Sequence, residues 1–300
     1  MRTPESLTAL VTGATDGVGR EVATRLAQLG ATVLVHGRDD ARIEATIAAI
    51  RERTGACDLR PLRADLSRLA EVDGLADEVL ASVDELNLVV SNAGVGFGPP
   101  TGHREVSPDG HELRWAVNHL APHHLLRRLA PLLCRSAPAR VVAVTSIGQA
   151  ALDLDDLQTE HDWDGTLAYR RSKLAATMSA FDLAEGLRGT GVAVHVLHPA
   201  TLMDTAMIRE AEVPPESTVE QGVTALVRLT LDPELDHRTA GFFSGSYPDD
   251  AALHAQVSDE HVRAELRRRT EETVAATLGG PDVPAQAGTP DAQPDSMTFV

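Results

Sequence analysis

Tyr169 and Lys173 are the residues of this chain whose types and spacing most clearly suggest chemistry. Lys173 is the single lysine among 27 lysines and arginines. A position that keeps lysine in such a sequence needs a compact ammonium rather than a planar guanidinium. Residues at i and i+4 share one helix face, so the ammonium would lie beside the phenol and favour its ionised form. The pair predicts an acid/base site, and the alternative is a surface lysine beside a packed tyrosine.

A glycine-rich segment near the N-terminus follows the apolar run at residues 7–13. It reads Thr12-Gly13-Ala14-Thr15-Asp16-Gly17-Val18-Gly19, and residues of helical type follow at 21–30. Glycines let the backbone turn tightly and approach a pyrophosphate, which the N-terminal end of a helix attracts through its free N–H groups and dipole. A strand, a glycine turn and a helix in this order predict a dinucleotide-binding site, and the alternative is a simple turn.

The end of the second apolar run indicates which dinucleotide is bound. A cofactor without a 2′-phosphate needs an acidic residue here to hold the ribose hydroxyls, whereas an arginine suits the phosphate. The position of the acid is Gly37 in this chain, and Arg38 follows it. This favours NADP(H) over NAD(H). Asp16 argues against NADP(H) because its charge would repel the phosphate, and a solvated surface residue is the alternative reading of Arg38.

Length and charge limit the class of protein. The chain has 300 residues, a hydrophobic content of 43% and a net charge of −17. Such a surface repels nucleic acid and anionic membranes, so we expect small molecules or other protein chains as partners. The sequence has no apolar run of the kind found in signal peptides or membrane spans, which predicts a cytoplasmic protein. His119, His123 and His124 lack a carboxylate or cysteine at ligand spacing, so we expect no metal site.

Apolar runs of strand type alternate with longer amphipathic segments along the chain. Six runs, and a weaker seventh, lie at residues 7–13, 31–37, 59–65, 86–92, 139–146, 192–199 and 239–245. They predict a doubly wound parallel α/β sheet of about seven strands with helices on both faces. Ser217-x-x-Glu220 predicts a capping box, and residues 251–278 predict a last helix.

These elements predict one Rossmann-fold domain over residues 1–278. Its segment at about 200–218 is expected to lie on the substrate side. Residues 279–300 are rich in Pro, Gly and Asp and have no periodicity, so they predict a flexible tail or an arm docked on a partner. The helical segment 165–189 is apolar on more than one face.

Several motifs occur in a fixed order along the chain. They are the Thr12 to Gly19 loop, Asp65, Asn92-Ala93-Gly94, Asn118, Ser146, Tyr169 with Lys173, and His198-Pro199. With this ordered set the chain resembles the short-chain dehydrogenase/reductase family over roughly residues 5–275. The segments around Asn118 and Tyr169, and extra residues at 151–165, are most similar to the retinol-dehydrogenase-like branch. Branch membership says little about the substrate.

The resemblance implies which residues would contact the cofactor. They are Gly13, Thr15, Asp16, Gly17, Val18, Gly19, Arg38, Asp65, Leu66, Asn92, Ala93, Gly94, Tyr169, Lys173, Pro199, Thr201 and Thr205. In the family, a residue like Asp65 touches the adenine, and the turn that begins at Asn92 steadies the sheet beneath the cofactor. The family's Pro-Gly turn reads Pro199-Ala200 here, and the threonine after it is shifted by one position. The nicotinamide-side contacts of Thr201 and Thr205 depend on this altered turn. In this family the helix corresponding to 165–189 pairs across a two-fold axis, which predicts a homodimer or homotetramer.

The same resemblance implies hydride transfer between a nicotinamide and a ketone or secondary alcohol. Reduction needs a hydride at carbon, a proton at oxygen and stabilisation of the developing charge. Tyr169 would give the proton, because its pKa of about 10 keeps it protonated and the Lys173 cation lowers that pKa. Ser146 would bind the substrate oxygen. Asn118 would hold a water that relays protons to Lys173.

The identity of the substrate is not readable from the chain. Trp163, Met203 and Met207 are expected to line an apolar pocket for a small or polycyclic molecule, although methionines also fill cores. The arginine bias suggests a bacterial source and, by loose association, a ketoreductase of specialised metabolism. The rival functions are an epimerase or dehydratase that uses the bound cofactor, and a non-catalytic dinucleotide-binding sensor, which would not need the acid/base residues.

Overall fold

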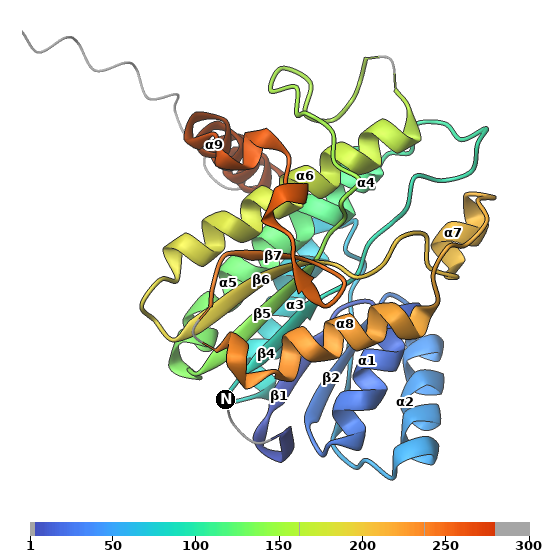
Figure 1. Ribbon diagram of the computed structural model, residues 1–300, viewed down its shortest axis with the longest axis vertical. Helices are drawn as coiled ribbons and strands as arrows, with labels where there is room; N and C mark the ends of the chain where they lie inside the picture. The colour runs from blue at the N-terminus through green and yellow to red at the C-terminus, as the bar shows by residue number, and fades with distance from the viewer. Residues whose placement is uncertain (1–3, 162, 237, 280–300) are drawn as a thin grey trace, which may run out of the picture.

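The computed structural model describes residues 4–161, 163–236 and 238–279. Its centre is one sheet of eight strands in the order β3-β2-β1-β4-β5-β6-β7-β8, with helices on both faces (Figure 1). Strands β1 to β7 pair in parallel, and the short β8 pairs antiparallel with β7. The predicted doubly wound sheet is confirmed, and β8 extends the expected set of about seven strands by one.

The strands are β1 Thr8–Val11, β2 Thr32–Gly37, β3 Leu59–Arg63, β4 Leu88–Ser91, β5 Ala139–Val144, β6 Val192–His198, β7 Gly241–Ser244 and β8 Tyr247–Pro248. The α-helices are α1 Gly17–Gln28, α2 Asp40–Thr54, α3 Leu69–Ser82, α4 Leu113–Trp115, α5 Ala121–Arg135, α6 Gly165–Gly186, α7 Ala206–Glu210, α8 Val219–Leu231 and α9 Glu260–Thr277. A π-helical turn, η2 Ala116–Leu120, joins α4 to α5. Short 3-10 helices are η1 Pro4–Ser6, η3 Pro233–Leu235, η4 Asp250–Ala252 and η5 Ala255–Ser258.

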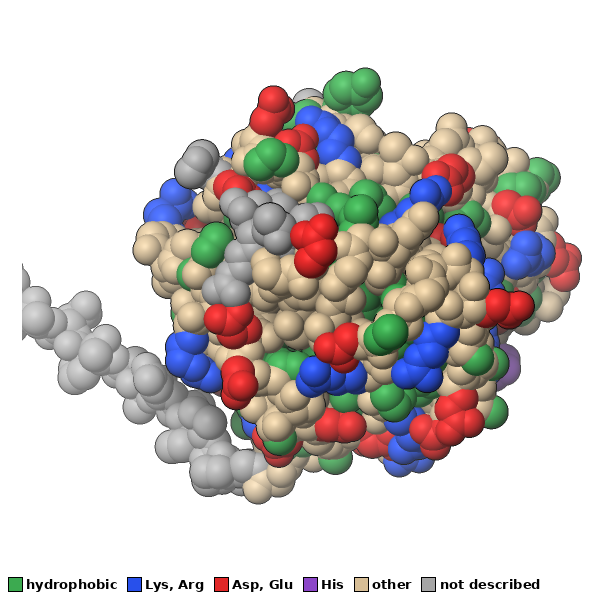
Figure 2. Space-filling model, turned by 90° about the horizontal axis from the view of Figure 1, so that it is seen from below, with side chains coloured by type: hydrophobic (Ala, Val, Ile, Leu, Met, Phe, Trp, Pro, Cys, Tyr) green, Lys and Arg blue, Asp and Glu red, His purple; other side chains and the backbone are tan. Residues whose placement is uncertain are grey.

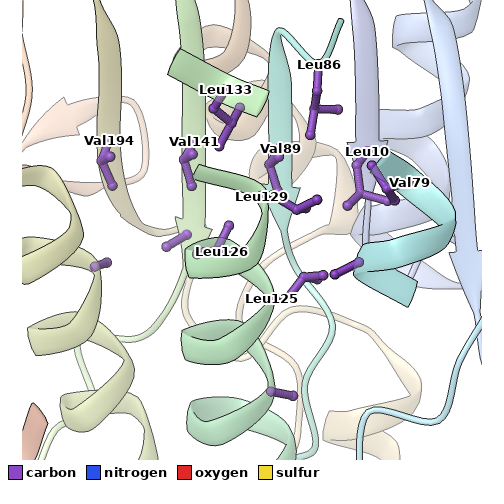
Figure 3. Packing of buried hydrophobic residues seen from close by; sticks show 14 of the residues in the cluster. Leu10, Val79, Leu86, Val89, Leu125, Leu126, Leu129, Leu133, Val141 and Val194 are labelled. Atoms are coloured by element: carbon purple, nitrogen blue, oxygen red, sulfur yellow. The ribbon is translucent and has the colours of Figure 1, made fainter. Parts of the chain in front are cut away.

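The strands are apolar almost throughout because both faces of the sheet are buried. Successive residues of a strand point to opposite faces. One face packs against α3, α5 and α6, and Figure 3 shows Val89 and Val141 of the sheet beside Leu125 and Leu129 of α5. The other face packs against α1, α2 and α8 through the alternate strand positions, such as Val90. The two layers fix the strand ends, from which the loops of the site emerge.

Helix α6 is covered by α9 on the side that turns away from the sheet (Figure 1). Leu174 and Met178 of α6 are fully buried in one apolar cluster with Leu266 of α9. Arg263 of α9 also lies 3.3 Å from the carboxylate of Asp182 in α6. The pairing of this helix across a two-fold axis was predicted from its apolar faces and from the family resemblance. Because α9 of the same chain covers these residues, the prediction of a dimer or tetramer loses the first of these two bases and stays untested.

Two boundaries predicted from the sequence were wrong. The capping box lies one residue later than expected, since Thr218 is the N-cap and exchanges hydrogen bonds with Gln221. Glu220 instead forms an ion pair with Arg25 at 3.1 Å. The last helix begins at Glu260, where Asp259 caps it, and η4 and η5 occupy the residues before it. Of the predicted tail at 279–300, residues 280–300 lie outside the described residues.

One face of the molecule carries charged side chains of both signs, and Figure 2 shows the acidic and basic side chains interspersed over it. Among the described helices, none combines the length and the apolar character that crossing a membrane requires.

Candidate active site

The predicted binding residues lie at the carboxyl ends of the parallel strands. These ends share one edge of the sheet, so the loops after β1 to β6 meet there. The order of the strands reverses between β1 and β4. Ligands of doubly wound sheets bind in the crevice at such a point. The loop with Gly13 follows β1 and the turn with Asn92 follows β4, so the two flank this crevice.

The glycine loop is held in shape from the β4 side. Gly13 and Gly17 have φ angles of +65° and +50°, a region that glycine adopts without strain. The Asn92 side chain donates hydrogen bonds to the carbonyl oxygens of Thr12 at 3.0 Å and Gly13 at 3.3 Å. A Cβ at Gly19 would overlap the Gly13 carbonyl, so the first turn of α1 approaches the loop only with glycine there. The arrangement provides the tight turn and the helix N-terminus that suit a pyrophosphate.

The neighbouring residues of the loop are also in place. Val18, in the first turn of α1, is buried, and the Ala93 N–H donates to the Thr12 hydroxyl at 3.1 Å. Asp65 follows β3 and accepts hydrogen bonds from the backbone and hydroxyl of Ser67, and Leu66 beside it is buried. These contacts fix the loop after β3, where the family resemblance predicts the adenine.

His36 is a residue of this region that the sequence analysis missed. Its Nδ1 accepts a hydrogen bond from the Gly13 N–H at 3.2 Å, so Nε2 carries the proton and donates to the Ala64 carbonyl at 3.2 Å. Burial lowers the pKa of His36 to about 4, and the ring is neutral at pH 7. The imidazole thus ties the glycine loop to the end of β3. The one signal in the sequence is a histidine inside the otherwise apolar run at 31–37.

The end of β2 has no room for an acidic residue. A Cβ at Gly37 would lie 2.6 Å from the Thr15 methyl group and 2.9 Å from Ile43. Arg38 follows and is exposed. Within the described residues its guanidinium has no hydrogen bond or ion pair, so it is available to an anion.

Asp16 has two partners that reduce its effect on an anion. Its carboxylate caps α1 by accepting a hydrogen bond from the Gly17 N–H at 2.7 Å. Its other oxygen lies 3.3 Å from the Arg42 guanidinium of α2. The negative charge that argued against a bound 2′-phosphate is therefore paired.

Ser146, Tyr169 and Lys173 are brought together from β5 and α6. Asp164 caps α6 by accepting a hydrogen bond from the Leu167 N–H at 2.7 Å, so the helix begins just before Tyr169. A hydrogen bond joins the side chains of Ser146 and Tyr169. The Lys173 ammonium lies 5.7 Å from the centre of the Tyr169 ring. Two hydroxyls and a cation therefore converge at the crevice.

The pKa of Tyr169 departs from the expectation. Lys173 was expected to lower it, but burial raises the pKa of the phenol, and the hydrogen bond with Ser146 opposes this only in part. Burial removes water from the phenol and so disfavours its charged form. The Lys173 ammonium lies beside the ring rather than at the hydroxyl, so it does not offset this effect. Burial also lowers the pKa of Lys173 to about 8. Both side chains carry their protons at pH 7.

Lys173 is buried, yet it makes few hydrogen bonds of its own. Its ammonium has three donors and reaches the Val144 carbonyl at 3.4 Å. Gly94 lets the backbone pass close to it, because a Cβ there would lie 3.4 Å from the Lys173 nitrogen and 3.0 Å from the Asn118 side-chain oxygen. A buried cation with one hydrogen bond among the described residues has donors left that suit the ribose hydroxyls of a nicotinamide nucleotide.

Asn118 lies in the π-helical turn η2, which explains an asparagine in the middle of a helical segment. Its side chain accepts a hydrogen bond from the Val95 N–H at 2.8 Å and donates to the Val95 carbonyl at 3.0 Å. It also donates to the Ser172 hydroxyl at 3.0 Å. The amide is thus occupied in joining the loop after β4 to α6. The water relay expected at this residue stays a prediction.

The substrate side differs in part from the prediction. The ring that packs on Tyr169 is Phe97, edge to face at 5.6 Å, and the sequence analysis missed it. Met207 of α7 packs against Gly96 in the same loop, on the expected side. Trp163 instead packs on the Arg114 guanidinium, 5.3 Å from its ring centre. Met203 was expected in the pocket, but it packs against Gly222 of α8 and lies partly buried against the apolar cluster there.

The turn after β6 separates the two threonines. Thr205 lies across the crevice from the glycine loop, with its methyl group 3.6 Å from a Cβ placed on Gly17. Thr201 is exposed, and its hydroxyl shares a hydrogen bond with the His198 ring at 3.2 Å. Pro199 packs towards Gly222 of α8. Thr205 is therefore the threonine placed beside the predicted pyrophosphate position.

Comparisons with known proteins agree with this geometry. The sequence pattern of the short chain dehydrogenase family matches residues 7–214. Human retinol dehydrogenase 14 is 35% identical over 287 residues, which cover 86% of this chain and 83% of that protein. A crystal structure of an uncharacterized protein from Mycobacterium paratuberculosis superposes with a TM-score of 0.71 at 25% identity, covering 90% and 93% of the two chains. Another, from Escherichia coli CFT073, assigned as a short chain dehydrogenase and complexed with NADPH, gives 0.66 at 26% identity, covering 81% and 97%.

Proposed function

The chain belongs to the short chain dehydrogenase family, in its retinol-dehydrogenase-like branch, and on this premise we propose that it is an NADPH-dependent oxidoreductase of a ketone or secondary alcohol. The observation that carries the proposal is the hydrogen bond between Ser146 and Tyr169, with the Lys173 ammonium beside the phenol. Two hydroxyls that meet in this way can bind one carbonyl oxygen together. Ketone reduction needs this arrangement, because charge develops on that oxygen.

Each of the three side chains has a separate task. A bound nicotinamide would supply the hydride. Tyr169 donates the proton to the substrate oxygen, and its raised pKa keeps that proton available at neutral pH. Ser146 holds the same oxygen in line with the phenol. Lys173 stabilises the phenolate that remains, and its spare donors suit ribose hydroxyls, which a planar guanidinium would meet with the wrong geometry.

The preference for NADPH is supported by charge and space at the end of β2. Gly37 leaves little room for the carboxylate that would hold an unphosphorylated ribose, and the Arg38 guanidinium beside it has no partner among the described residues. Arg42 pairs with Asp16 and reduces the repulsion of a phosphate. A charge-assisted contact of this kind contributes about 1.4 kcal/mol or more, which is roughly tenfold in affinity.

The substrate class proposed is a small, apolar or polycyclic molecule. Phe97 and Met207 give the loop beside Tyr169 an apolar character, and Ile147, directly after Ser146, is 41% exposed. A role as a ketoreductase of bacterial specialised metabolism rests on composition alone. Because one relative is named retinol dehydrogenase, retinoids belong among the compounds to be tested.

Three further properties are proposed with the function. We expect the enzyme to be cytoplasmic and to act on small molecules without binding nucleic acid or membranes, which the net charge of −17 supports. A homodimer or homotetramer stays a prediction, with an interface away from the α6 residues that α9 covers. Light scattering at micromolar concentration distinguishes these assemblies from a monomer of 31.9 kDa.

The decisive test is NADPH oxidation with a panel of aromatic polyketide, keto-sugar, steroid and retinoid carbonyl compounds. We expect net formation of NADP⁺ with at least one compound, and its loss in Tyr169→Phe. An altered product without net NADP⁺ would indicate an epimerase or dehydratase that uses the bound cofactor. Tight NADPH binding without chemistry on any compound would indicate a dinucleotide sensor.

A further inference from the structure

The segment that follows Ser146 is anchored on a part of the chain far away in sequence. Gln149 donates from its side-chain nitrogen to the Ser146 carbonyl at 3.0 Å. Its side-chain oxygen accepts a hydrogen bond from the His254 N–H at 3.0 Å. One amide group therefore links the backbone of Ser146 to the segment before α9.

A second glutamine makes a matching link three residues further along the loop. The Gln256 side chain accepts a hydrogen bond from the Leu152 N–H at 2.7 Å and donates to the Leu152 carbonyl at 3.1 Å. Both backbone groups of Leu152 are thus satisfied by one side chain. The Gln256 N–H in turn donates to the His254 ring at 3.2 Å, which fixes the two anchors relative to each other.

The anchoring segment is itself fixed. Val257 of η5 is buried in the apolar cluster that contains Leu174 of α6, and η5 lies against α6 and α9 (Figure 1). Arg269 of α9 donates to the Leu154 carbonyl at 2.5 Å. The loop after β5 is therefore bound at three successive points to the C-terminal region, which lies beyond the part of the chain that the family pattern matches.

We propose that Gln149 and Gln256 are positioning residues, through which the C-terminal region sets the orientation of Ser146. The proposal rests on the role of Ser146 in the proposed function. The Ser146 hydroxyl accepts a hydrogen bond from the Gly148 N–H at 3.0 Å, so the turn 146–149 decides where that hydroxyl points. Gln149 closes this turn on Ser146. A misplacement of about 1 Å in such a group costs on the order of a hundredfold in rate.

The two glutamines contact the loop that carries Ser146 and not the glycine loop or Arg38. The glycine loop and Arg38 belong to the β1 and β2 ends of the sheet, whereas Gln149 and Gln256 contact the loop after β5. Their removal should therefore lower kcat and leave the affinity for NADPH unchanged. A role in stability alone would lower the midpoint of unfolding without lowering kcat in the folded enzyme.

The test uses three neutral exchanges of similar size in the full chain. Gln149→Met and Gln256→Met remove the two anchors. Gln158→Met is the matched control, because Gln158 lies in the same excursion between β5 and α6 but bonds to the Glu112 N–H instead. We expect kcat to fall about tenfold to a hundredfold in the first two variants, with the NADPH dissociation constant within about twofold of wild type. The control should keep its kcat.

A second readout needs no substrate. The chain has 2 tyrosines, Tyr169 and the exposed Tyr247, so a Tyr247→Phe background reports the ionisation of Tyr169 alone by absorbance after a rapid pH jump. Because the Ser146 hydrogen bond lowers the pKa of Tyr169, displacing Ser146 should raise that pKa in Gln149→Met and Gln256→Met. The control variant should titrate like the wild type.

The outcomes separate this inference from the proposed function. If both anchor variants fold and match the wild type in kcat and in the Tyr169 titration, the inference is overturned. If the wild type reduces no carbonyl compound, the proposed function fails, and the titration alone decides the inference. Should Gln149→Met not fold, Gln256→Met gives the same two readouts.

Discussion

Lys173 donates a hydrogen bond to the Val144 carbonyl at 3.4 Å from a buried position in the middle of the site. Burial lowers the pKa of Lys173 to about 8, so the ammonium is charged at pH 7. Among the described residues the ammonium has this one hydrogen bond, and it lies close to Gly94, where a Cβ would be 3.4 Å from its nitrogen. This relationship explains why the position holds the chain's single lysine: a compact cation must serve the phenol and further acceptors in a confined space.

Lys173→Arg should keep the fold and the net charge and lose most turnover. The larger, planar guanidinium would press on the space at Gly94 and present its donors in a fixed fork. We expect kcat to fall about a hundredfold or more, as for the removal of an acid/base element. Steady-state rates with an accepted ketone measure this, and the reverse exchange at the exposed Arg188, Arg188→Lys, is the control. A near-normal kcat would make the lysine an accident of composition.

Tyr169→Phe should reduce kcat at least as strongly and leave NADPH binding nearly intact. The phenol acts on the substrate oxygen, whereas the ring that packs on Phe97 at 5.6 Å is retained. Fluorescence titration should give an NADPH dissociation constant within about twofold of wild type, a difference of less than 0.5 kcal/mol. Tyr247→Phe, at an exposed position, is the control for the loss of a hydroxyl. Substantial turnover by Tyr169→Phe would remove the phenol from the proton transfer.

The parts of the site that the sequence predicts are those formed by residues close together in the sequence. The loop after β1 needs glycine for its turns and for the approach of α1, so Gly13 and Gly19 can be recognised directly in the sequence. Tyr169 and Lys173 share a helix face whatever packs around them. The order of apolar runs predicts the doubly wound sheet, because both of its faces must be buried.

The residues that the sequence did not reveal act across long separations. Phe97 contacts Tyr169 from the loop after β4, and Gln149 binds a segment 105 residues away. No local pattern marks either contact. The sequence gives no reason to distinguish Met203 from Met207. In the structure Met203 packs against α8, whereas Met207 packs against Gly96 in the loop beside Tyr169. The direction of a side chain in an irregular segment is set by tertiary packing, and periodicity carries no information about it.

Arg38→Gln should remove most of the preference for NADPH. In the wild type we expect NADPH to bind at least about tenfold more tightly than NADH, the effect of one charge-assisted contact. In the variant, the ratio of the two dissociation constants should approach one, with little change for NADH. Arg135→Gln is the matched control, because Arg135 is also exposed but lies at the C-terminal end of α5. Equal affinities of the wild type for NADPH and NADH would mean that the Asp16 carboxylate still repels the 2′-phosphate, although Arg42 pairs with it.

His36 should make stability depend on pH in the acidic range. Its pKa is about 4 in the folded chain and 6.5 in its ordinary state, so the unfolded chain takes up the proton first as pH falls. The stabilisation is therefore fully present above pH 6.5 and is lost as pH falls towards 4, by about 3 kcal/mol for this shift. His36→Gln, neutral throughout, should be less stable than wild type at pH 7.5, and the difference should shrink as the pH is lowered.

Urea unfolding at pH 7.5, 6 and 5 measures this difference directly. Comparing variant with wild type at each pH removes the contribution of His123, His195 and His198, whose pKa values are also lowered by burial. It also removes the relief of charge repulsion that acid brings to a chain of net charge −17. His103→Gln, at an exposed position, should show no pH-dependent difference. The free energy of unfolding of His36→Gln and wild type could instead differ by the same amount at every pH. That result would show that the imidazole stabilises the glycine loop by packing alone and that its pKa is not lowered by folding.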